Sequence, residues 1–188
     1  MRATFCAIGC IFFAGTSLPG QIKTPAPVTL LYRFDHFHSQ IAFQEMKREL
    51  ETVMKPLGYA PDWRGVGDAT VKDSFENLVM VDFRGRCLME AADSPVQTNG
   101  AALAKTQVSD GTVLPFSEVE CDQVRASLHS VWGTRAQQSD LALGRALGRV
   151  LAHELYHVLT RTTAHSSDGI EKKSLSQSEL VSEQLQFK

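Results

Sequence analysis

The chain contains 188 residues, of which 43% are hydrophobic and 21% are charged, and its formal net charge is −2. A charge this close to zero, without a basic cluster, argues against a nucleic-acid or anionic-membrane partner. The length is enough for one domain with one sizeable hydrophobic core.

Residues 1–20 have the pattern of a secretory signal peptide. Arg2 provides the positive charge, residues 3–18 are almost wholly apolar, and small residues near Ser17 and Gly20 offer cleavage sites. The apolar run is short for a transmembrane helix, so we expect no stable membrane insertion after cleavage. Retention as an uncleaved anchor is the alternative. The predicted location is therefore secreted or periplasmic.

The four cysteines fit an exported protein. Cys6 and Cys10 would leave with the signal peptide, so Cys87 and Cys121 remain as an even pair. In an oxidising compartment such a pair is expected to form a disulfide, and two buried thiols are the alternative.

The next segments alternate between β and α character. Residues 21–27 are expected to be an extended linker, followed by a strand at Val28–Phe34, an amphipathic helix at Gln40–Lys55, a second strand at Leu78–Phe83 and a loop at residues 91–102.

A turn is predicted in the middle of the chain. Asp110-Gly111 favours a tight turn, so Ala102–Val108 and Val113–Val119 are expected to pair as a hairpin. The segment Asp122–Val131 that follows fits either a strand or a short helix.

Beyond it the pattern predicts a long, buried helix. Either Ser139 or Asp140 suits its N-cap. Gly144 and Gly148 lie four residues apart and would let another backbone approach closely, at a cost in helix propensity. Apolar residues recur at helical spacing, namely Leu143, Leu147, Val150, Leu151, Leu155 and Val158.

The most informative motif, His153-Glu154-Leu155-Tyr156-His157, lies late in this predicted helix. Residues i and i+4 share one face of a helix, so His153 and His157 can bind one metal ion. Glu154 would then lie beside the open metal position and could act as general base toward a bound water. A helix with two surface histidines and an unrelated glutamate is the alternative.

His165 is the nearest candidate for a third ligand. On an uninterrupted helix it would lie about 12 Å along the axis from His157, too far to share a metal ion. The helix must therefore end between them, and the threonines of Thr160–Thr163 suit such an end. Three histidines and a water form a catalytic zinc site, because one position stays open.

At these residues the chain resembles the metzincin clan of zinc peptidases, whose pattern is H-E-x-x-H-x-x-G-x-x-H followed by a methionine turn. His153, Glu154 and His157 match that pattern. Thr160 stands at the position of the glycine, and Thr163 stands at the position of the third histidine.

The resemblance runs from Ser139 to the C-terminus and is partial. His165 comes two residues later than the third histidine of the family. Glu171 stands where the methionine is expected, and no methionine follows Met89. The resemblance implies a zincin fold in which an edge strand of the sheet pairs with an extended peptide substrate. Residues 113–119 and 102–108 are the two candidates for that edge.

A second class of zinc peptidase offers another third ligand. In glutamate-zincins such as thermolysin, this ligand is a glutamate on a later helix, and Glu179 could occupy that place. Ser176 and Glu179 also have the spacing of a capping box, which is the preferred interpretation of this carboxylate. His165 is therefore favoured over Glu179.

Three further histidines are less informative. His36 and His38 alternate and could form a second metal site, although a role at a strand end or helix cap is the simpler expectation. His129 is expected to be structural.

Together these patterns predict an α+β fold, in which a small mixed sheet packs on the long helix of a single zincin-like catalytic domain spanning residues 28–188. The predicted function is that of a secreted metallopeptidase that hydrolyses peptide or protein substrates with Zn²⁺ and Glu154. Two alternatives are a catalytically silent zincin-like domain that uses zinc for structure or peptide binding, and a metal-free secreted domain.

Overall fold

The computed structural model describes residues 24–70, 74–89, 101–128 and 136–188. The predicted signal peptide, His129 and most of the predicted loop at 91–102 lie outside these ranges. Within them, no helix is both long enough and apolar enough to span a membrane.

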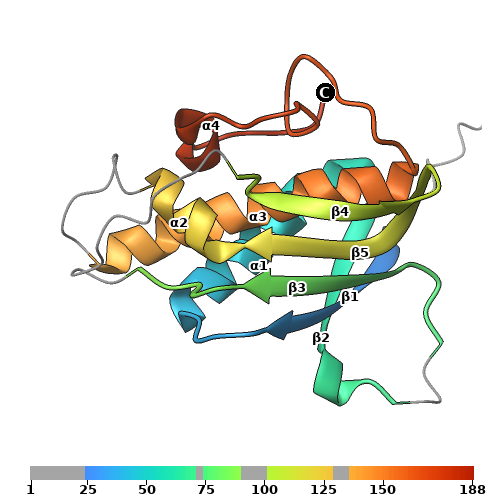
Figure 1. Cartoon of the computed structure of the whole chain (residues 1–188), viewed down its shortest axis with the longest axis horizontal. Coiled ribbons are helices and arrows are strands. Elements are labelled where there is room, and N and C mark those ends of the chain that lie inside the picture. Colours follow the sequence, from blue (N-terminus) through green and yellow to red (C-terminus); the bar gives the residue numbers. More distant parts are fainter. Residues whose placement is uncertain (1–23, 71–73, 90–100, 129–135) are drawn as a thin grey trace, which may run out of the picture.

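The described chain forms one five-stranded sheet with helices on one face (Figure 1). Four strands are parallel, and the edge strand β4 is antiparallel to its neighbour β5. The order across the sheet is β2-β1-β3-β5-β4, with bounds β1 Ala26–Phe34, β2 Tyr59–Gly65, β3 Leu78–Arg84, β4 Ala104–Ser109 and β5 Thr112–Glu120.

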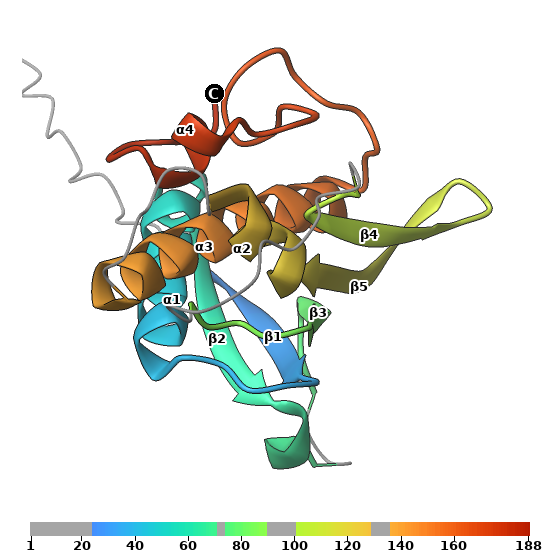
Figure 2. The same ribbon diagram turned by 60° about the vertical axis from the view of Figure 1, so that its left-hand side comes forward.

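Alternating side chains explain which face of the sheet the helices cover. In β3, every second residue is buried, namely Val79, Val81 and Phe83. These residues belong to one hydrophobic core together with buried residues of two long helices, α1 (Gln40–Met54) and α3 (Ala136–Thr160). The two helices pack against each other (Figure 2). The short helices are α2 (Cys121–Leu128) and α4 (Gln177–Val181), with 3₁₀ turns at Lys55–Leu57 and Val66–Asp68.

The two glycines of α3 let α1 approach closely, as predicted. A Cβ atom on Gly144 would lie 2.4 Å from the carbonyl oxygen of Ala42, and one on Gly148 would lie 2.9 Å from that of Met46. Any larger residue at either position would push the two helices apart.

The structure confirms the mixed α and β character, both predicted strands before residue 90, the helix at α1 and the hairpin. Asp110 and Gly111 form the hairpin turn with positive φ angles of 49° and 75°. The undecided segment after β5 is helical from Cys121 to Leu128. Of the two predictions for the exposed edge, the one for residues 113–119 is wrong. These residues belong to β5, which lies between β3 and β4.

Two boundaries were also predicted wrongly. Helix α3 begins at Ala136, so neither Ser139 nor Asp140 is its N-cap. The Asp140 carboxylate instead accepts hydrogen bonds from the Ser39 hydroxyl (2.5 Å) and the Met89 N–H (2.9 Å). Residues 26 and 27, assigned to the linker, belong to β1 because they pair with β2.

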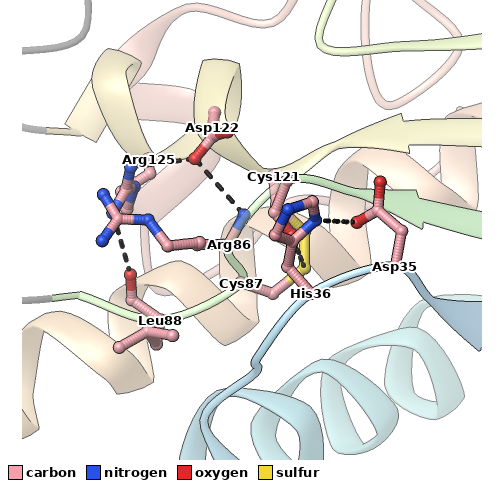
Figure 3. The surroundings of a disulfide bond; sticks show 9 residues. Asp35, His36, Arg86, Cys87, Leu88, Cys121, Asp122 and Arg125 are labelled. Carbon is pink, nitrogen blue, oxygen red and sulfur yellow. Dashed lines mark hydrogen bonds and ion pairs between the residues drawn. A yellow bond between two sulfur atoms is a disulfide. The ribbon is translucent and has the colours of Figure 1, made fainter.

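The predicted disulfide between Cys87 and Cys121 is present (Figure 3). It links the segment after β3 to the first residue of α2, and both cysteines are buried. Beside it, the Asp122 carboxylate accepts hydrogen bonds from the Arg86 N–H (3.3 Å) and the Arg125 guanidinium (2.8 Å). The covalent and polar links together fix α2 against the end of β3.

Candidate metal centre

The end of α3 determines where the third histidine lies. After Thr160 the chain reverses at Arg161, whose φ is +53°. The Thr162 N–H donates to the His157 carbonyl (3.2 Å) and the Arg161 N–H donates to the Val158 carbonyl (3.3 Å), which is the Schellman pattern of helix termination. The predicted helix end within Thr160–Thr163 is therefore confirmed, and it turns the chain back toward the motif.

The structure brings His153, His157 and His165 together. One ring nitrogen from each lies within 4.8 Å of the other two, close enough to bind one metal ion. The His165 ring stacks on His153 with 5.2 Å between ring centres and meets His157 edge-on at 4.8 Å. Within the described ranges, no other group of His, Cys, Asp or Glu residues meets this criterion.

Backbone carbonyls fix which nitrogens face the centre. His153 Nδ1 lies 2.7 Å from the Ile170 carbonyl oxygen, and His157 Nδ1 lies 2.8 Å from that of Thr162. A carbonyl oxygen can only accept, so each Nδ1 carries the proton, and each Nε2 of a neutral ring presents a lone pair. Such second contacts are typical of metal-binding histidines, whose ring orientation they set.

The spacing of the two Nε2 atoms suits a shared cation. They lie 3.0 Å apart, so two lone pairs face each other at hydrogen-bond distance without a proton between them. A cation at this point would remove the repulsion. Nitrogens at the usual distance from one tetrahedral zinc ion are about 3.3 Å apart, close to the observed separation.

The surroundings favour neutral, metal-binding imidazoles. Burial lowers the pKa of His153, an effect that the hydrogen bond to Ile170 partly offsets. Burial and the neighbouring His157 lower the pKa of His165. A neutral ring keeps the lone pair that a metal requires.

A tight turn follows His165, in the place where the resemblance expects a methionine turn. The Ser166 N–H donates to the Glu171 carbonyl (3.1 Å), and Gly169 between them has a φ of +73°. Ile170 is fully buried, and its carbonyl holds His153. The Glu171 side chain is also buried and accepts a hydrogen bond from the Lys188 N–H (3.0 Å). The turn thus orients one of the histidines without a methionine.

Glu154 points toward the edge strand. Its Oε2 accepts a 2.6 Å hydrogen bond from the Thr106 hydroxyl of β4. Burial raises the pKa of Glu154, and the bond from Thr106 and the nearby His157 and His165 act in the opposite direction. A buried carboxyl with a raised pKa is suited to accept and return a proton near neutral pH.

Glu179, the alternative third ligand, lies in a different arrangement. Its carboxylate accepts hydrogen bonds from Lys172 Nζ (2.7 Å), the Ser176 hydroxyl (2.6 Å) and the Ser176 N–H (2.7 Å). This is the predicted capping box of α4, and Glu179 is not a member of the histidine cluster.

The remaining histidine candidates are separate from the centre. His38 stacks on Phe34 with 4.0 Å between ring centres, and burial lowers its pKa. His36 lies 2.9 Å from the Asp35 carboxylate. Neither belongs to the histidine cluster, and a role at a strand end or helix cap stays the expectation for both.

Two cavities flank the motif helix. A cavity of about 310 Å³ is lined by the three histidines and by Thr106, and another of about 260 Å³ lies between α3, the start of β4 and residues 172–175. Glu154 lines both of them, as does the exposed Lys173. The candidate base therefore lies where a ligand occupying either cavity could meet it.

Sequence patterns missed the contacts around the cluster. Thr106 and Ile170 reach the motif from other parts of the chain, and neither carries a local signal of that role. A comparison with protein-family models, curated proteins and solved structures found no match.

Proposed function

We propose that this protein is a secreted zinc metallopeptidase with a zincin-like fold related to the metzincins. The observation that carries the proposal is the combination of three converging imidazoles with a buried glutamate one residue after the first of them. A structural zinc site has no need of a carboxyl group in that place, whereas hydrolysis needs a base there.

The three histidines fit a catalytic zinc site. His153, His157 and His165 would hold the ion through neutral rings, and the exposed position of His165 keeps one side of the cluster open. When bound, zinc would acidify a water molecule and polarise the carbonyl group of the substrate. Three nitrogen ligands and an open position are the usual set for this chemistry.

Glu154 would act as the proton carrier. Its carboxylate would accept the proton from the attacking water and then deliver that proton to the nitrogen of the leaving amine. Protonation of the amine completes cleavage of the peptide bond. Burial, which raises the pKa of Glu154, strengthens the carboxylate as the proton acceptor in the first of these two steps.

Strand β4 offers a docking edge for an extended peptide. In the described part of the chain no strand pairs with its outer edge, and β4 lines both cavities beside the motif. Unpaired main-chain groups at a sheet edge can bind a peptide by strand addition. This arrangement supports residues 102–108 as the substrate edge.

The disulfide supports the proposed location. Structural disulfides persist in oxidising compartments and are rare in the cytosol. Export through residues 1–20 remains a prediction, which N-terminal sequencing of the mature protein after expression would test.

A peptide-library assay tests the proposed activity. The zinc-loaded wild type should cleave peptides, chelation should abolish cleavage, and zinc should restore it. Glu154→Gln should keep the metal and lower kcat by at least about 10²-fold, because it removes the general base. An equally active Glu154→Gln variant would contradict the mechanism. Zinc binding without any cleavage by the wild type would favour the catalytically silent domain.

A further inference from the structure

The edge strand does more than line the cavities, because one of its side chains contacts the candidate base. Thr106 lies in β4 with its side chain facing α3, and its hydroxyl lies 2.6 Å from Glu154 Oε2 and 3.3 Å from the Glu154 carbonyl oxygen. Among the described residues, the other carboxylate oxygen, Oε1, has no hydrogen-bond partner.

A second hydroxyl extends this contact into the sheet. Ser117 of β5 is directly opposite Thr106 in the strand pairing, and their hydroxyl oxygens lie 3.1 Å apart. Thr106 has one proton, and the carboxylate is the stronger acceptor, so Thr106 donates to Glu154 and receives the proton of Ser117. Ser117 is buried, which limits competition from water.

The strand pairing helps to fix these hydroxyls. The β4–β5 register is regular up to the pair Thr106 and Ser117 and shifts immediately afterwards, before Val108. Irregularities of this kind redirect side chains and often occur next to active sites. Pro115, which lacks an N–H to donate to the ladder, lies within the irregular part of β5.

We propose that Thr106, supported by Ser117, is a positioning residue for Glu154. Its hydroxyl holds Oε2 and leaves Oε1 free to receive the proton of the water. This inference rests on the proposed function. It also means that the strand offered to the substrate and the strand that orients the base are the same element.

Kinetics of matched variants test the proposal. Thr106→Val removes the hydroxyl and keeps the shape, and we expect kcat to fall about 10- to 100-fold because a misplaced group loses much of its effect. KM and zinc content should stay near the wild-type values. Thr106→Ser should restore most of kcat, because it returns the hydroxyl. Thr112→Val, in the same hairpin, is the control and should behave as wild type.

Three results would overturn the proposal: an unchanged kcat in Thr106→Val, a rise in KM alone, or no rescue by serine. If Thr106→Val does not fold, Ser117→Ala provides the second test. It should lower kcat by less than the loss of Thr106, and an unchanged kcat would again count against the inference.

A crystallographic comparison separates this inference from the proposed function. In zinc-loaded wild type, Glu154 should keep one carboxylate orientation bonded to Thr106, and in Thr106→Val the carboxylate should rotate or spread over several orientations. The same orientation in both crystals would refute the positioning role even if the wild type hydrolyses peptides. Absence of hydrolysis in the wild type would refute the proposed function and leave this structural comparison valid.

Discussion

Glu179 is the residue whose ionisation the fold shifts most clearly. Hydrogen bonds from Lys172 and then from Ser176 lower its pKa from the ordinary value of 4.5 to about 2. A carboxyl group with a lowered pKa contributes stability above its unfolded-state pKa, and this contribution is lost as the pH falls through the folded-state value. The relevant window therefore lies between pH 4.5 and about 2.

Glu179→Gln should lower the melting temperature at pH 7, since the substitution removes the negative charge that pairs with Lys172 and weakens the cap of α4. The difference from wild type should shrink below pH 4.5 and vanish below about pH 2, where the Glu179 carboxyl group is protonated and neutral like the glutamine. Thermal melts across this range measure it. Glu183→Gln, an exposed charge change nearby, is the control, and a difference that does not depend on pH would contradict the assignment.

Spacing along one helix is enough to identify three residues of the site. His153 and His157 are four residues apart and share one face of the helix, and Glu154 directly follows His153, so sequence alone predicts that the three lie close together. Thr106 could not be predicted, because it meets Glu154 across a separation of 48 residues. The chain reversal before His165 includes a positive φ angle at Arg161, which the surrounding threonines do not specify.

At the scale of the element, helix α3 is followed directly by a residue, Arg161, whose side chain disfavours the backbone conformation that it adopts. Arg161 adopts the left-handed conformation that glycine usually fills after a helix. Arg161→Gly should match or exceed the stability of the wild type, whereas Arg161→Val should lose about 1 kcal/mol or more through the clash of its branched side chain. Zinc affinity should follow the same order, because this reversal places His165. Melting curves and zinc titrations measure both quantities, and a fully stable Arg161→Val would contradict the account.

Close contact between α1 and α3 should make Gly144 intolerant of substitution. Gly144→Ala should cost about 2 kcal/mol, because its methyl group would overlap the Ala42 carbonyl and separate the helices. Gly67→Ala is the matched control, since a Cβ atom there meets nothing within 4 Å. Denaturant unfolding of the two variants measures the difference, and equal stability would show that the helices can adjust.

Element prediction succeeded where hydrophobic periodicity was strong and failed where tertiary contacts decide. The edge strand β2 was not predicted, because Pro61 and polar residues give it no alternating pattern. Proline is tolerated there since an edge strand leaves one side of its backbone unpaired. The wrong N-cap has a similar cause, because Asp140 bonds to two distant segments in place of its own helix end.

At the scale of the molecule, the sheet, the helix layer and the C-terminal segment meet around the motif. Figures 1 and 2 show the C-terminal segment lying beyond the β4 edge, next to α3. Buried Arg149 joins these parts, because it binds Glu49 of α1 (2.7 Å) and the Glu179 (2.6 Å) and Ser182 (2.7 Å) carbonyls. This arrangement depends on packing between residues that are far apart in the sequence. Composition and residue spacing therefore predict the fold class, but they do not predict how the sheet, the helices and the C-terminal segment are placed.

The disulfide should stabilise the whole domain without taking part in the chemistry. It closes a separation of 34 residues, for which the chain-entropy relation gives about 3–4 kcal/mol. A Cys87→Ala/Cys121→Ala variant should melt at a lower temperature and still bind zinc below that temperature. A phosphine reductant should lower the melting temperature of the wild type and leave that of the variant unchanged. Loss of zinc in the folded variant would contradict this separation of roles.

Zinc content of the purified protein tests the central claim most directly, with His165→Ala and Glu179→Ala measured beside the wild type. The account predicts one zinc per wild-type chain, a marked loss in His165→Ala and full retention in Glu179→Ala. Loss of zinc in Glu179→Ala, with zinc retained in His165→Ala, would indicate that Glu179 of α4 is the third ligand. A wild type that binds no zinc would contradict the metal centre and the proposed peptidase with it.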